Sequence, residues 1–131
     1  MAELLVPISP GELIDKITIL EIKSARMTDE AKLRNVRTEL QLLNETWSAS
    51  AFAAIDISVE WKGLRDVNGQ LWDIEDDIRD KERDGQFDEK FIELARAVYV
   101  TNDERAALKR KINVKLGSAL VEEKSYKEYK K

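Results

Sequence analysis

One stretch, from Leu71 to Gly85, limits what this chain of 131 residues can fold into. Its apolar residues Leu71, Ile74 and Ile78 recur at spacings of three and four, and carboxylates occupy seven of the twelve remaining positions. This pattern is typical of a helix with one buried side. Such a helix has to cover its apolar side by packing against other elements. We therefore predict that the stretch is the second half of a long helix in a helical bundle.

The segment from Ser9 to Glu12 marks the start of the first helix. It places serine at the cap, Pro10 at the first helical position and Glu12 at the third, and Ile8 and Leu13 flank it as a hydrophobic staple. The helix that follows carries an apolar arc too wide for a single seam. We predict that it is the most buried element and that it contacts two neighbours or a second subunit.

Three more helices are predicted from caps and apolar spacing. Thr28 is placed to cap the second helix, and Ser58 to cap the third, which ends at Gly85. Asp88 is placed to cap the fourth, which ends before Gly117. The predicted fold is therefore all-α, an antiparallel bundle of four main helices.

The ends of the chain complete the predicted organisation. Residues 1–8 are expected to form a short extended arm, because Pro7 restricts the residue before it. Residues 118–123 are a candidate short helix, and the basic tail at 124–131 is expected to be flexible or folded back on the acidic helix. With no repeat and no break in composition, residues 1–131 are predicted to form a single helical domain.

Composition narrows the functional classes. The chain has no cysteine and no histidine, so catalysis would have to use carboxylates, lysine, tyrosine or arginine, and a bound metal would be a hard ion with oxygen ligands. The net charge of -4 is a mixture of both signs and disfavours nucleic acid as a partner. No leader and no apolar run long enough for a membrane span are recognised. We expect a cytoplasmic protein that does not bind membranes and that forms a homo-oligomer, with a dimer favoured.

A polar interruption in the fourth helix suggests a site. The apolar seam gives way to Asn102 and Arg105, and an arginine on the inward side of a bundle needs a charged partner. We predict that the acidic half of the third helix supplies it. The group then either binds an anionic small ligand or is a buried network that sets helix register. The residues of this predicted cluster are Asp15, Lys16, Trp72, Glu75, Asp76, Asn102 and Arg105.

Two enzymatic alternatives remain open. The carboxylate pairs Glu12 with Asp15 and Asp73 with Asp76 resemble those of the all-α nucleotide pyrophosphatases, and this likeness implies a Mg²⁺ or Mn²⁺ site and phosphohydrolase activity. No cofactor is expected outside that alternative.

Helical chorismate mutases are the second enzymatic candidate for a chain without histidine. In that case Arg26, Arg105 and Lys109 would hold the substrate carboxylates.

Four longer stretches resemble a bacterial family of small proteins described only as a domain of unknown function. They are Val6 to Lys23, Leu71 to Arg79, Thr101 to Asp103 and Glu122 to Tyr126. The resemblance implies a bacterial origin and one compact domain, and it assigns no activity, ligand or catalytic residue. The leading functional hypothesis is a non-enzymatic interaction or ligand-binding module, and whether the protein is an enzyme is left open.

Overall fold

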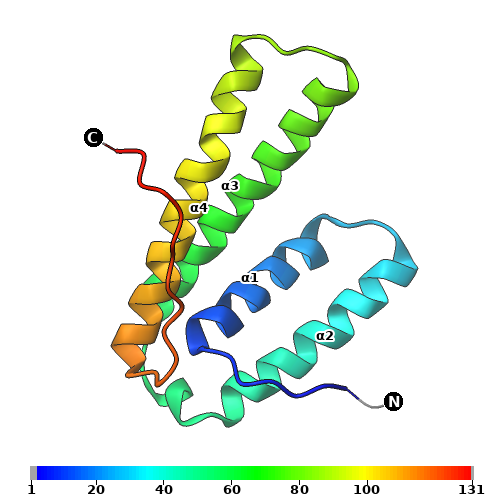
Figure 1. The fold of residues 1–131 in the computed structure, drawn as a ribbon. Helices are drawn as coiled ribbons and strands as arrows, with labels where there is room; N and C mark the ends of the chain where they lie inside the picture. The colour runs from blue at the N-terminus through cyan, green and yellow to red at the C-terminus, as the bar shows by residue number, and fades with distance from the viewer. Residues whose placement is uncertain (1–2, 131) are drawn as a thin grey trace.

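The computed structural model describes residues 3–130, and within that range every regular element is a helix (Figure 1). The predicted all-α fold class is thereby confirmed. Met1, Ala2 and Lys131, at the ends of the predicted arm and tail, lie outside the described residues. The elements in chain order are α1 (Pro10–Arg26), α2 (Glu30–Ala49), the short 3-10 helix η1 (Ala51–Ala54), α3 (Ser58–Arg83) and α4 (Glu89–Leu116).

The start of α1 has the predicted cap. The Ser9 hydroxyl accepts a hydrogen bond from the backbone N–H of Glu12 at 3.2 Å, and Pro10 occupies the first turn, where its missing N–H is not needed. Lys23 and Arg26 lie in the last turn, where positive charge is favoured by the helix dipole. The amino-terminal signals therefore predict the beginning of this helix correctly.

Helix α1 is the centre of the molecule, because α2, α3 and α4 all pack against it. Figure 1 shows it between α2 and the hairpin of α3 and α4. Its wide apolar arc supplies Ile14 and Ile17, which are completely buried and belong to the main core cluster with Leu64 and Ile112. The prediction that the first helix contacts more than one neighbour is confirmed within a single chain.

Helix α2 covers one side of α1 and is the least buried of the four. Its buried residues are Leu33 and Val36, and Leu40, Leu43 and Trp47 pack partly against the core. One side of α2 therefore remains open to solvent along its whole length.

Helices α3 and α4 form a long hairpin whose far end projects beyond α1 and α2 (Figure 1). Asp88 caps α4, and Gly85 and Gly117 follow α3 and α4 in left-handed conformations, with φ of 63° and 67°. These three predicted signals are confirmed.

The seam predicted in α3 is only half-buried. Leu71, Ile74 and Ile78 were expected to be fully buried in a bundle. In the projecting part of the hairpin, however, α3 packs against α4 with no third helix over it (Figure 1).

Two predicted helix caps and one predicted short helix were wrong. The cap of α2 is Asp29 and not Thr28, and Ser58 is the first residue of α3 and not its cap. The backbone N–H of Ser58 donates instead to Asp56 at 2.9 Å. The segment 118–123 is not helical, and the tail runs along α4 (Figure 1).

The closest approach between α1 and α4 occurs at Gly11, whose backbone N–H donates to the Asn113 side chain at 2.7 Å. A methyl group at Gly11 would lie 2.4 Å from the Lys109 carbonyl oxygen. We expect Gly11→Ala to lower the free energy of unfolding by about 1–3 kcal/mol through overpacking. Urea denaturation measures this change.

Gly69→Ala in α3 is the matched control, because its nearest neighbour would be an Arg26 nitrogen at 3.9 Å. This variant should be stabilised by up to about 1 kcal/mol through better helix propensity. Equal effects of the two substitutions would contradict the close approach of the helices.

Candidate functional site

A buried ion pair joins α1 to α4. The Arg105 guanidinium donates from Nε to Asp15 Oδ1 at 2.8 Å and from Nη2 to Oδ2 at 2.5 Å. Asp15 is only 1% exposed, whereas the side chain of Arg105 is 30% exposed. Two parallel charge-assisted hydrogen bonds fix the orientation of the pair as well as its distance. The pair therefore sets how α1 and α4 are aligned.

Two more polar side chains complete this interior group. Asn68 of α3 donates from Nδ2 to Asp15 Oδ1 and to Thr18 Oγ1, both at 3.0 Å. The Thr18 hydroxyl donates to the backbone carbonyl of Asp15 at 2.9 Å. Helices α1, α3 and α4 therefore meet at one carboxylate.

The pKa values of the pair follow from these contacts. Burial alone would raise the pKa of Asp15, but hydrogen bonds from Arg105 and Asn68 outweigh it and bring the pKa below its ordinary value of 3.8. The hydrogen bonds from Arg105 to Asp15 raise the pKa of Arg105 in turn, although burial opposes this. Both groups therefore remain charged at neutral pH.

A second group of charges lies one turn further along α4. The Lys109 ammonium contacts Glu12 of α1 and Glu122 of the tail, each at 2.7 Å. Burial lowers the pKa of Lys109, and the hydrogen bonds to the two carboxylates reverse this and raise it. We call Lys109, with the space that the Glu122 carboxylate fills, the lysine seat.

The tail is held to α4 along several turns. Glu123 pairs with Arg110 at 3.3 Å, and Lys124 pairs with Asp103. Further on, the Tyr129 ring packs edge-on against Tyr99, with 4.9 Å between the ring centres. In Figure 1 the tail follows α4 and not the acidic half of α3. The Glu122 carboxylate thus reaches Lys109 from a segment with no helix of its own.

The predicted cluster is only partly assembled. The structure brings Asp15 and Arg105 together, leaves Lys16 exposed, and places Asn102 half-buried on α4.

The three predicted residues of α3 lie away from that pair. Trp72 packs under Arg26, with 5.7 Å from the guanidinium carbon to the ring centre, Glu75 pairs with Arg79 of its own helix, and Asp76 is exposed.

The prediction that the acidic half of α3 neutralises Arg105 was wrong. The antiparallel register of α3 and α4 brings Asn68, and not the carboxylates after Trp72, to the level of Arg105, and α1 inserts Asp15 there. Asp73, the first of those carboxylates, pairs with Arg26 at 2.6 Å instead.

Sequence reasoning missed Asn68, Thr18 and Glu122 as partners. One signal was available, because Asn68 and Thr18 are polar residues at inward positions of apolar helices. Glu122 gave no such signal, since nothing in the local sequence predicts that the tail returns to α4.

The carboxylates of the metal alternative do not form one site. Glu12, Asp15 and Asp73 are each paired with a different cation, namely Lys109, Arg105 and Arg26. Within residues 3–130 there is no group of three or more aspartates or glutamates arranged to hold a metal ion.

In the chorismate mutase alternative, Arg26 would act together with Arg105 and Lys109, but it lies far from them. Arg26 lies roughly 16 Å from the level of Asp15, at 1.5 Å per residue along α1.

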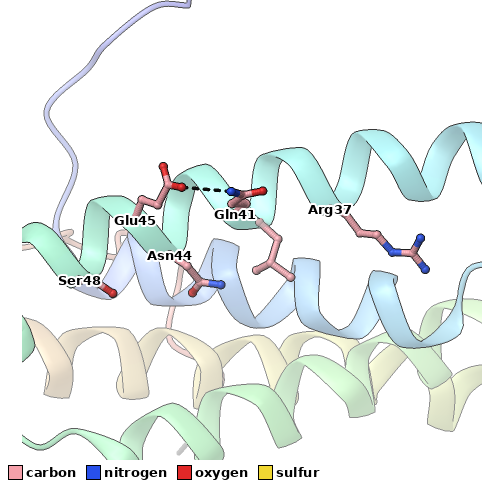
Figure 2. A pocket seen from close by; sticks show the side chains of 6 residues that line it. Arg37, Gln41, Asn44, Glu45 and Ser48 are labelled. Atoms are coloured by element: carbon pink, nitrogen blue, oxygen red, sulfur yellow. Dashed lines mark hydrogen bonds between the residues drawn. The ribbon is translucent and has the colours of Figure 1, made fainter.

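A shallow hollow lies elsewhere, along the open side of α2 (Figure 2). Arg37, Asn44 and Ser48 lie along it, and Gln41 donates to Glu45 at 3.2 Å. The residues that line it come from this single helix, so it does not bring different elements together as the group around Asp15 does.

Fold and site together define an all-α protein organised around a buried charge cluster. The chain matches a family of unknown function, DUF6165, over residues 4–129, and it belongs to that family. No match was found among curated proteins or among solved structures. No helix among residues 3–130 is long and apolar enough to cross a membrane.

The ion pair predicts a specific dependence of stability on pH. Because the pKa of Asp15 is lowered on folding, its contribution is complete above pH 3.8, the ordinary value, and is lost as the pH falls through the lowered value. We expect Asp15→Asn to lower the free energy of unfolding by about 3–5 kcal/mol at neutral pH, since it leaves Arg105 without its counter-charge. Urea denaturation at neutral and acidic pH measures both effects.

Asp73→Asn is the control for this experiment, because it removes a carboxylate from an exposed pair with Arg26. The expected loss is about 0–1 kcal/mol. At acidic pH the free energies of unfolding of the native chain and of Asp15→Asn should become more similar. Losses of similar size for the two variants would contradict a central role for Asp15.

Proposed function

We propose that the protein is a non-enzymatic binding module for a small ligand that carries one carboxylate group. The ligand would bind at the lysine seat, where it would replace Glu122. The observation that carries this proposal is a lysine that is only 10% exposed and that receives a carboxylate from the irregular tail. The sequence further predicts a bacterial, cytoplasmic protein, and the proposal assumes that setting.

The surroundings of Lys109 can hold a ligand carboxylate in the place of Glu122. Its ammonium has three N–H donors, of which Glu12 and Glu122 engage two. The first turn of α1 lies beside it, and the positive end of a helix dipole attracts anions. Lys109 therefore binds a second carboxylate, from the tail, in addition to Glu12 of α1.

The charge balance favours a monoanion over a dianion. Arg105 and Lys109 are balanced by Asp15 and Glu12 from the helices, so Glu122 contributes one further negative charge. A carboxylate ligand would leave that balance unchanged. A phosphate dianion would add a second charge to a partly buried site, where uncompensated charge is costly.

Glu122 of the tail is the carboxylate that a ligand would displace from Lys109. Glu122 is 59% exposed and forms a single ion pair with α4. A ligand carboxylate can take the place of this one contact while Lys109 stays paired with Glu12, so the buried ammonium is not left without a counter-charge. The interior pair of Asp15 and Arg105 would keep the helices in place during the exchange.

Deletion of residues 118–131 should open the seat to added carboxylates. We expect benzoate to raise the melting temperature of the shortened chain, because a ligand stabilises the folded state to which it binds. Inorganic phosphate at the same ionic strength should raise it less. Full-length protein should need about tenfold more benzoate, since Glu122 competes for Lys109.

Two lysine variants of the shortened chain provide the control. Lys109→Met should abolish the benzoate effect, whereas Lys111→Met, which removes an exposed cation from the same helix, should preserve it. An effect that survives in Lys109→Met, or no effect in the shortened chain, would rule out the lysine seat as a carboxylate site.

A further inference from the structure

We propose that the amino-terminal arm, residues 3–8, docks into a tryptophan-lined groove of a second copy of this chain. The exchange would be reciprocal, so that each copy gives an arm and receives one. This inference concerns self-association and is independent of the lysine seat. It rests on the arm, on the groove, and on where the two lie in the fold.

The arm presents an unusually apolar exposed surface. Leu4, Leu5 and Val6 are 94%, 87% and 69% exposed, and Ile8 is also exposed. Four apolar side chains in five consecutive positions are a contiguous patch and not scattered surface residues, and such patches mark interaction sites. Pro7 favours an extended backbone at Val6. The arm is therefore suited to lie in a groove as an extended segment.

The groove lies where α2 ends and α3 begins, and it has a volume of about 480 Å³. Trp47 and Trp61 form part of its wall, with their rings edge-on and 5.9 Å between centres. Ile55 adds an exposed apolar side chain. Large aromatic side chains at a concave surface are typical anchors for a binding partner.

The hollow on α2 is a poorer receptor for the arm. Leu40 is its only aliphatic lining residue, and the others are polar or charged (Figure 2). The tryptophan groove takes its lining from the end of α2, from η1 and the segment after it, and from the start of α3, so it can contact an extended segment from more than one side. We therefore assign the arm to the tryptophan groove.

The charges of arm and groove are complementary. Glu3 precedes the apolar residues of the arm, and the groove is lined by Arg65 and by Lys62, which pairs with Asp66 of its own helix at 2.7 Å. Arg65 has only a long contact of 3.8 Å with Glu21, so its remaining donors can bind another carboxylate. The acidic residue of the groove, Asp56, is occupied as the acceptor of the Ser58 N–H. An acidic, apolar segment therefore fits this groove better than a basic one.

The positions of arm and groove suit a two-fold dimer. The arm leaves α1 at the end of the molecule where η1 and the start of α3 lie (Figure 1). A two-fold axis near that end would bring each arm to the groove of the other copy, as an isologous interface requires. Six extended residues span roughly 20 Å, enough to reach across a subunit boundary.

Sedimentation velocity over a range of concentrations tests the proposal. We expect a reversible monomer–dimer equilibrium for the native chain and a monomer after deletion of residues 3–8. Because most of the arm is exposed, the deletion should leave the helix content of the monomer unchanged. Leu5→Asp and Ile55→Asp, one on each side of the contact, should each raise the dimer dissociation constant at least about tenfold.

Ile92→Asp is the matched control, since Ile92 is an exposed apolar residue on α4 outside the groove. It should leave the dimer intact. Tryptophan emission should shift to longer wavelength on dilution or on deletion of the arm, because Trp47 and Trp61 lose their cover.

Three results would overturn the proposal. The first is a native chain that stays monomeric at every concentration. The second is a dimer that survives deletion of the arm. The third is an arm-dependent emission change in a strict monomer, which would show that each arm fills the groove of its own chain.

Discussion

The bidentate ion pair between Asp15 and Arg105 is the contact on which the arrangement of α1, α3 and α4 depends. A carboxylate that is 1% exposed is stable only when its oxygens are fully engaged, and Arg105 and Asn68 provide that engagement from two other helices. A one-residue slip of any of these helices would separate donors from acceptors. The apolar core supplies most of the driving force for folding, and this polar group selects one alignment of the helices.

Much of the fold could be predicted from local sequence. The caps at Ser9 and Asp88 and the glycines after α3 and α4 each act through contacts within a few residues, so the sequence alone reveals them. The wide apolar arc of α1 also predicted its central position correctly. Where prediction of helix ends failed, at Thr28 and Ser58, a neighbouring aspartate provides the hydrogen bond instead.

The site was harder to predict, because its partners are distant in the chain. The need of Arg105 for a counter-charge follows from its inward position, but many carboxylates of the chain could supply it. The acidic half of α3 was the wrong prediction. The carboxylate that pairs with Arg105 is determined by the register of α3 and α4 and by how far α1 extends along them. Gly11 is part of that answer, since its lack of a side chain lets α1 approach the backbone of α4 at Lys109. No periodicity in the sequence reports such a distance.

The projecting end of the α3–α4 hairpin has a consequence for the dynamics of the molecule. There the two helices have only each other to pack against, and much of the surface consists of charged side chains. Regions with few buried apolar contacts open locally at a lower free energy than the global unfolding of the protein. Backbone amides near Gly85 should therefore exchange with solvent long before those around Ile14. Local unfolding would begin at this end of the hairpin, and the contacts around Asp15 would be lost last.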